Sequence, residues 1–227
     1  MESMESIFKR VLIVILLALV PLGSARLGVA ASSSAPTILV FGDSLSAGYG
    51  IGLERSWVNL LQQRLQREGY DYRVANASIS GETTLGGKNR IAAALRTHSP
   101  QIVIVELGAN DGLRGSSIKS MRSNLAAIID QAKKTGARVL LVGIKLPPNY
   151  GMDYTRKFQD VYTALARENK IALAPFMFEG FAEQSEFFLA DSVHPNERAQ
   201  ATILDNIWTP LAPLLKAAPG HAGHAYN

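Results

Sequence analysis

One serine, one aspartate and one histidine stand in an order that could support nucleophilic catalysis. Ser44 follows an apolar run, and Asp191 and His194 lie three residues apart near the end of the chain. A serine hydroxyl becomes an effective nucleophile when a base takes its proton and a third group orients that base. The pattern predicts Ser44 as the nucleophile, His194 as the base and Asp191 as the residue that orients His194.

Acyl transfer also requires hydrogen-bond donors that face the oxyanion developing on the substrate carbonyl. Asn110 follows another apolar run and offers a side-chain amide. Gly81 has no side chain to obstruct its backbone N–H, and the N–H of Ser44 is a third donor. We therefore expect Ser44, Gly81 and Asn110 to form an oxyanion hole.

Strands and helices that alternate along the chain must position these residues. Five apolar runs predict the buried strands 37–41, 72–77, 101–106, 138–144 and 171–174. Amphipathic patterns predict helices at 57–65, 118–132, 158–165 and 203–208. Such alternation is typical of a parallel sheet covered by helices on both faces. Ligands of these sheets bind beyond the carboxyl ends of the strands, where the predicted site residues fall.

Two kinds of hydrolase share some of these features. The order serine, aspartate, histidine also occurs in α/β-hydrolases, but their nucleophile elbow needs Gly-x-Ser-x-Gly, and here Ser46 replaces the second glycine. Asp43 and Asp111 could form the carboxylate pair of a glycoside hydrolase. We expect each of these two acids to accept hydrogen bonds within its own turn instead.

Four blocks of the chain resemble the motifs of the SGNH (GDSL-type) hydrolases. The blocks are Gly42–Leu45, Gly81, Gly108–Asp111 and Asp191–His194. Within that superfamily the chain is similar to the exported bacterial thioesterase I/protease I/lysophospholipase group and to related arylesterases. This similarity is carried by FGDSLSAGY at 41–49, NASISG at 76–81, VELGANDGLR at 105–114, LPPNYG at 146–151 and DSVHPN at 191–196.

The resemblance implies a fold, a reaction and a set of residue roles. The fold is a flavodoxin-like three-layer α/β/α sandwich with a five-stranded parallel sheet in the order 2-1-3-4-5. The reaction is hydrolysis of carboxylic esters or thioesters (aryl and acyl esters, acyl thioesters, lysophospholipids) through an acyl-enzyme on Ser44. The resemblance gives Asp191, His194, Gly81 and Asn110 the roles predicted above, and implies no metal or organic cofactor.

The substrate-binding residues are predicted less directly. Leu113, Leu146, Pro147 and Tyr150 could line an acyl channel, and packing within their loops is the other interpretation. Lys88 and Asn89 depart from the apolar or small residues expected in close relatives, so we expect them to alter the rim that meets the substrate. Two alternative functions stay open: a carbohydrate O-acetyl esterase, and a non-catalytic envelope binding protein on the same fold.

Composition restricts the remaining function classes. The 227 residues include no cysteine, which excludes a thiol nucleophile, a disulfide scaffold and cysteine-ligated metals. The net charge is +4 with no run of five like charges, so no nucleic-acid partner is expected.

The first 31 residues have the pattern of a signal peptide. Lys9 and Arg10 precede an aliphatic run of ten residues, 11–20, which is too short to span a bilayer. We expect cleavage after Ala30 or Ala31, leaving a hydrolase domain at 32–216 and a flexible tail at 217–227. The mature chain is then periplasmic or secreted, has no stable membrane span, and is a monomer or weak oligomer.

Overall fold

Five parallel strands form one sheet in the order β2-β1-β3-β4-β5 in the computed structural model, which describes residues 35–215. The strands are β1 (Thr37–Gly42), β2 (Arg73–Asn76), β3 (Ile102–Glu106), β4 (Arg138–Val142) and β5 (Ala172–Ala174). All five predicted strands and their predicted order are confirmed. The predicted signal peptide at 1–31 and the predicted tail at 217–227 lie outside the described residues.

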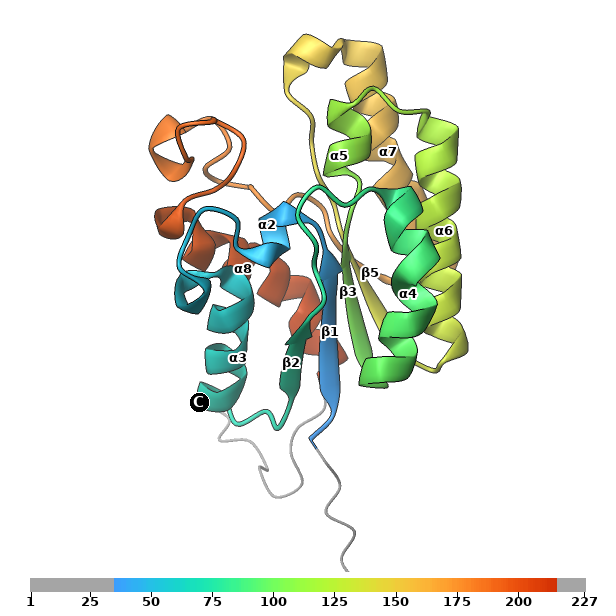
Figure 1. The fold of residues 1–227 in the computed structure, drawn as a ribbon, viewed down its shortest axis with the longest axis vertical. Coiled ribbons are helices and arrows are strands. Elements are labelled where there is room, and N and C mark those ends of the chain that lie inside the picture. Colours follow the sequence, from blue (N-terminus) through green and yellow to red (C-terminus); the bar gives the residue numbers. More distant parts are fainter. Residues whose placement is uncertain (1–34, 216–227) are drawn as a thin grey trace, which may run out of the picture. The chain divides into compact units, whose positions relative to one another are not determined.

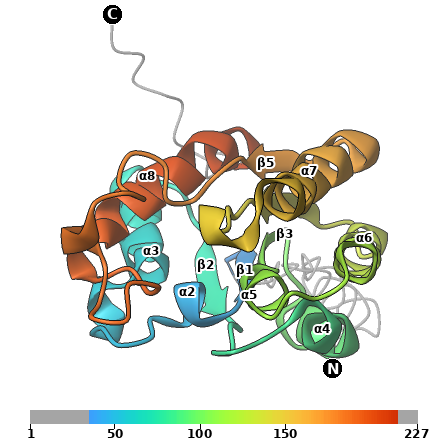
Figure 2. The same cartoon turned by 90° about the horizontal axis from the view of Figure 1, so that it is seen from above.

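Helices cover both faces of the sheet (Figures 1 and 2). On one face α3 (Trp57–Arg67) packs beside α8 (Gln200–Leu211). On the other face α6 (Ile118–Lys134) lies between α4 (Thr84–His98) and α7 (Met152–Asn169). The predicted three-layer α/β/α architecture is therefore confirmed. Within residues 35–215, no helix is long and apolar enough to cross a membrane.

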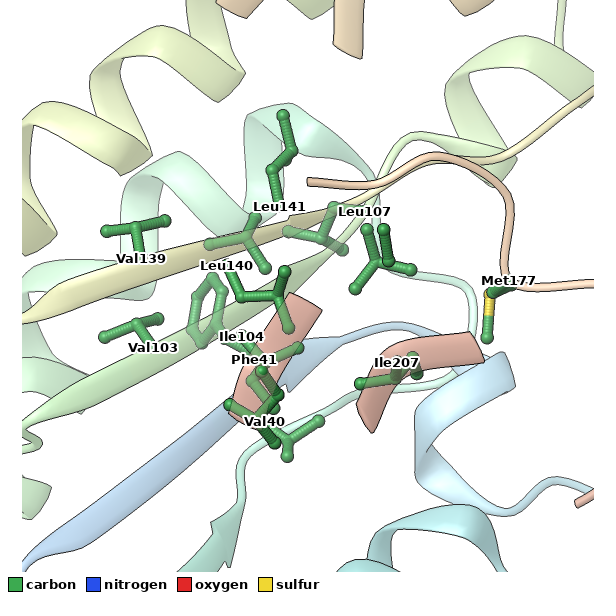
Figure 3. Packing of buried hydrophobic residues seen from close by; sticks show 14 of the residues in the cluster. Val40, Phe41, Val103, Ile104, Leu107, Val139, Leu140, Leu141, Met177 and Ile207 are labelled. Carbon is green, nitrogen blue, oxygen red and sulfur yellow. The ribbon is translucent and has the colours of Figure 1, made fainter. Parts of the chain in front are cut away.

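The central strands are apolar because both of their faces are covered. Every residue of β1 and β3 is buried, and aliphatic side chains from these strands meet those of the helices in one core. Figure 3 shows part of this core, where Ile104 of β3 and Val40 of β1 lie near Ile207 of α8. Burial on two faces explains the nearly continuous Val, Ile and Leu of these segments.

Helix α4 was not among the predicted helices. Its buried residues are Thr84, Gly87, Ile91 and Leu95, so only two large apolar side chains mark its inner face. Gly87 lies so close to the sheet that a Cβ atom there would come within 2.5 Å of the Leu107 side chain. A helix that packs closely through a glycine lacks the strong apolar stripe from which helices are predicted.

The carboxyl edge of the sheet carries two short helices. One residue, Asp43, separates β1 from helix α2 (Ser44–Ala47), and two residues separate β3 from α5 (Ala109–Leu113) (Figure 1). Because β1 and β3 are neighbours, with Gly42 paired to Glu106, their two connections lie side by side. The loop between β5 and α8 reaches the same edge, where it brings His194 to Ser44.

Candidate active site

Ser44 is the first residue of α2 and is half-buried. Asp43 caps this helix, because its Oδ1 atom accepts a hydrogen bond from the Leu45 backbone N–H at 3.0 Å. Leu45 and Ser46 are buried beneath the turn and fix it against the sheet. The cap and these anchors hold the Ser44 side chain at the carboxyl edge of the sheet.

His194 joins the other two residues predicted for catalysis. Its Nε2 atom lies 2.9 Å from Ser44 Oγ, and its Nδ1 atom lies 2.7 Å from Asp191 Oδ2. The other carboxylate oxygen of Asp191 accepts the backbone N–H groups of His194 and Val193 at 3.0 and 2.9 Å. These two backbone hydrogen bonds are the main reason that the pKa of Asp191 is lowered to about 2.

The loop that carries His194 is braced on two sides. The Leu189 N–H donates to the His194 carbonyl at 2.8 Å, and Phe188 forms a bridge with Pro195. On the other side the Tyr49 ring packs against the imidazole, with 4.4 Å between ring centroids. The imidazole is therefore held by side-chain contacts to Ser44, Asp191 and Tyr49.

Asn110 lies in α5, next to the turn that carries Ser44. Its Nδ2 atom donates to Asp43 Oδ2 at 3.2 Å and to the Glu82 carbonyl at 3.0 Å. The Asp43 contact ties this amide to the residue that caps α2. Both N–H groups of the amide are engaged in this structure, so donation to an oxyanion would share or replace one of these two hydrogen bonds.

Two backbone N–H groups at this edge are free to bind a ligand. Within residues 35–215, neither the Ser44 N–H nor the Gly81 N–H donates a hydrogen bond. Gly81 adjoins Glu82, whose carbonyl accepts from Asn110, and the Arg114 guanidinium donates to the Gly81 carbonyl at 3.2 Å. The three predicted oxyanion donors thus lie in one neighbourhood, although Gly81 does not line the cavity described next.

An apolar cavity of about 700 Å³ opens beside Ser44 and His194. Leu113, Leu146 and Pro147, three of the residues proposed from the sequence to bind substrate, line it. Tyr150 does not: its hydroxyl donates to the Leu113 carbonyl at 3.2 Å, so its contact with the cavity is indirect. Most of the opposite wall comes from the β5–α8 connection, which contributes Phe176, Phe178, Phe181 and Phe188.

Lys88 and Asn89 correct a further expectation. Both side chains are exposed on α4, and neither lines the cavity. The predicted effect of these residues on the substrate rim therefore has no support in the structure.

The acids near the site are structural partners of other groups. Asp43 and Asp111 are both buried, so they are not a pair of carboxylates open to a sugar. The expectation for Asp111 was wrong, because Asp111 accepts hydrogen bonds from the backbone N–H and hydroxyl of Thr84, outside its own turn. Burial raises the pKa of Asp43 to about 7, and burial also raises the pKa of Glu106 well above its usual range.

Three features of the site were missed from the sequence. The contact of Tyr49 with His194 was missed because the two residues lie 145 positions apart in the chain. Phe176, Phe178 and Phe181, which line the cavity together with Phe188, were not singled out because no short motif joins these scattered aromatic residues. Glu106 could have been identified from the sequence, since it is a charged residue at the end of the apolar run Ile102–Val105. Among residues 35–215, no group of three or more His, Asp or Glu side chains is placed to hold a metal ion.

A hydroxyl, an imidazole and a carboxylate in series, beside an apolar cavity on an α/β/α sandwich, define a serine hydrolase. The chain belongs to the GDSL-like Lipase/Acylhydrolase family, whose model matches residues 40–202. This match runs from within β1 to the first residues of α8, both labelled in Figure 1.

Characterised relatives resemble most of the chain. Esterase TesA of Pseudomonas aeruginosa is 49% identical over 183 residues, which are 81% of this chain and 91% of that protein. The arylesterase of Vibrio mimicus is 44% identical and covers 78% of this chain and 88% of its own length. Thioesterase 1/protease 1/lysophospholipase L1 of Escherichia coli is 40% identical and covers 81% of this chain and 87% of its own length.

A solved structure agrees with the fold of the described residues. The psychrotrophic esterase EstA from Pseudoalteromonas sp., inhibited by monoethylphosphonate, has a TM-score of 0.75 and 40% sequence identity. The similarity covers 78% of this chain and 97% of that one. This agreement supports the three-layer SGNH hydrolase fold over the part of the chain that the comparison covers.

Proposed function

We propose that the chain hydrolyses carboxylic esters and acyl thioesters through an acyl-enzyme on Ser44. The observation that carries this proposal is the position of His194, which contacts Ser44 on one side and Asp191 on the other, beside the apolar cavity. The names of the relatives (esterase, arylesterase, thioesterase and lysophospholipase) support the same class of substrate.

The mechanism follows from the contacts of His194. Ser44 Oγ attacks the acyl carbonyl while His194 Nε2 takes its proton, and Asp191 stabilises the imidazolium that forms. The oxyanion of the tetrahedral intermediate accepts hydrogen bonds from the N–H groups of Ser44 and Gly81 and from the Asn110 amide. His194 then protonates the leaving alcohol or thiol. A water molecule, activated by the same imidazole, releases the carboxylic acid and restores Ser44.

A chain-length series tests the proposal directly. Wild-type protein is assayed with p-nitrophenyl esters from C2 to C16 and with an acyl thioester, and then treated with a fluorophosphonate. We expect turnover of medium-chain esters and one phosphonate adduct, located on Ser44 by peptide mass spectrometry. A strong preference for acetyl over octanoyl esters would favour a carbohydrate O-acetyl esterase. Absence of both turnover and labelling would contradict the proposal and favour a non-catalytic binding protein.

Replacement of Asn110 by alanine should slow the chemical step. Loss of one oxyanion donor costs about 10²- to 10³-fold in kcat in acyl-transfer enzymes, and we expect a similar decrease here. KM should change little, because the lost hydrogen bond strengthens in the transition state. Steady-state kinetics with p-nitrophenyl butyrate measure this separation. A larger effect on KM than on kcat would argue against Asn110 as an oxyanion donor.

Leu113→Trp tests whether the cavity holds the acyl chain. Leu113 lines the cavity, so the larger indole should occupy space that a long chain needs. We expect kcat/KM for C12–C16 esters to fall about tenfold or more, while the C2 ester changes less than about threefold. Lys88→Leu is the matched control, because Lys88 is exposed and outside the cavity. If Lys88→Leu changed the profile and Leu113→Trp did not, the acyl chain would lie elsewhere.

We also propose that the protein acts outside the cytoplasm, in the periplasm or after secretion. The support for this location is the signal-peptide pattern of residues 1–31.

A further inference from the structure

Glu106 is a fully buried carboxyl group beneath the turn that carries Ser44. Its Oε2 atom accepts a hydrogen bond from Ser46 Oγ at 2.7 Å and one from the Asp43 backbone N–H at 3.3 Å. Both donors belong to the first turn of α2 or to its cap. The carboxyl group lies directly against Gly42, where a Cβ atom would come within 2.6 Å of Oε2. The backbone of β1 and the helix that follows it are therefore packed onto this carboxyl group.

The second oxygen of Glu106 has no partner. Among the described residues 35–215, the Oε1 atom makes no hydrogen bond although it is buried. An ionised carboxylate with one bare oxygen in the interior loses its hydration without compensation, whereas a neutral carboxyl group loses far less. The geometry therefore favours the protonated form of Glu106.

The charged groups near Glu106 also favour its protonated form. Asp43 is buried next to Glu106, and its charge adds to the effect of burial in raising the pKa of Glu106. The cation Arg90 is already engaged by Glu82 at 2.6 Å and by the carbonyls of Ala77 and Gly42.

Two further titratable groups surround this pair of acids. Asp111 is held by Thr84, and the Tyr162 hydroxyl donates to the Leu107 carbonyl. Neither group offers Glu106 a positive charge. Two adjacent buried acids resist ionising together, and Glu106 is the one with the bare oxygen.

We propose that Glu106 is a positioning residue that works as a neutral acid: it holds Ser46 and the Asp43 N–H, and so fixes the turn that aims Ser44 at His194. The inference rests on the proposed role of Ser44 as nucleophile. Asp43 extends the same support to Asn110, whose amide it accepts. Glu106 itself does not touch the substrate, because it is buried and does not line the cavity.

The kinetic test compares an apolar variant with a neutral isostere. Glu106→Leu removes the acceptor for Ser46, and we expect kcat for p-nitrophenyl butyrate to fall about 10- to 100-fold with KM nearly unchanged. Glu106→Gln keeps an acceptor without a charge, so kcat should return to within about threefold of wild type. Ser46→Ala, which removes the donor instead, should lower kcat about tenfold even if Glu106→Leu does not fold.

A second measurement tests the proton without using activity. Below pH 4.5 the Glu106 carboxyl group is protonated in both the folded and the unfolded protein, so it adds no pH dependence to unfolding. Above that pH the unfolded chain ionises while the folded protein keeps the proton, so the wild type becomes less stable as pH rises. Glu106→Gln cannot ionise. Urea unfolding from pH 5 to 8 should show the wild-type unfolding constant rising against that of Glu106→Gln, by up to about tenfold per pH unit.

The outcomes separate this inference from the proposed function. A pH-independent ratio of the two unfolding constants would mean that Glu106 is ionised in the folded protein, which overturns the inference. Wild-type kcat in both Glu106→Leu and Ser46→Ala would remove the positioning role, as would a Glu106→Gln variant as slow as Glu106→Leu. If Ser44→Ala kept its activity, the proposed function would fail, but the unfolding result would still report the proton on Glu106.

Discussion

Ser44→Ala should reduce ester hydrolysis by about 10⁴- to 10⁶-fold, the range found when serine hydrolases lose their nucleophile. Alanine has no hydroxyl group, so the variant lacks the Oγ atom that lies 2.9 Å from His194 Nε2 in the wild-type protein. The fluorophosphonate adduct should also disappear. Both results are measured on purified protein, by initial rates with p-nitrophenyl butyrate and by intact mass.

A matched serine provides the control for this experiment. Ser80 is exposed and does not line the cavity, so Ser80→Ala should keep wild-type rates and labelling. The melting temperature of Ser44→Ala should stay within a few degrees of wild type, since one half-buried hydroxyl is lost. A phosphonate adduct on a different serine in Ser44→Ala would contradict the assignment.

Loss of His194 should be as severe as loss of Ser44. In His194→Ala the serine keeps its hydroxyl but has no base, so we expect kcat to fall about 10⁴- to 10⁶-fold. In Asp191→Asn, kcat should fall less, by about 10³- to 10⁴-fold, because asparagine keeps some of the contacts that aspartate makes. The asparagine oxygen can still accept the two backbone N–H groups of the loop, but its amide would donate to His194 Nδ1. The proton would then lie on Nε2 and face Ser44, which is the wrong tautomer for a base.

His98 is the control for these two variants. It lies at the end of α4, and it does not line the cavity. His98→Ala should therefore retain wild-type kcat and KM.

Backbone hydrogen bonds hold the pKa of Asp191 at about 2, so Asp191 stays ionised above pH 4. A loss of activity at any pH above 4 must therefore come from the titration of a group other than Asp191. Equal rates in Asp191→Asn and wild type would remove Asp191 from the mechanism.

The parts of the fold that could be predicted are those whose signal is local. The strands β1 and β3 are covered on both faces, so Ile38–Phe41 and Ile102–Val105 are marked by unbroken apolar residues. Helix α6 carries a regular apolar stripe and was predicted. Helix α4 was missed because its close packing depends on Gly87 and on the distant Leu107, which the local pattern does not show.

The same distinction applies to the site. Ser44, Asp191, His194 and Asn110 were found because their residue types carry chemistry and their motifs are short. Glu106 and Tyr49 were missed, since their roles depend on partners 60 and 145 positions away, Ser46 and His194 respectively. Tyr150 was expected in the cavity from its place in a loop, but its side chain turns to the Leu113 carbonyl.

The placement of the site along the chain makes hydrolysis a reporter of complete folding. Ser44 follows the first strand, whereas His194 comes after the fifth, 150 positions later. The Asp191–His194 contact spans one turn and can form early. The contact of His194 with Ser44 closes a loop of nearly the whole domain, and the entropy cost of closing that loop is large. In a refolding experiment, ester hydrolysis should therefore be among the last signals to recover, after the secondary structure has formed.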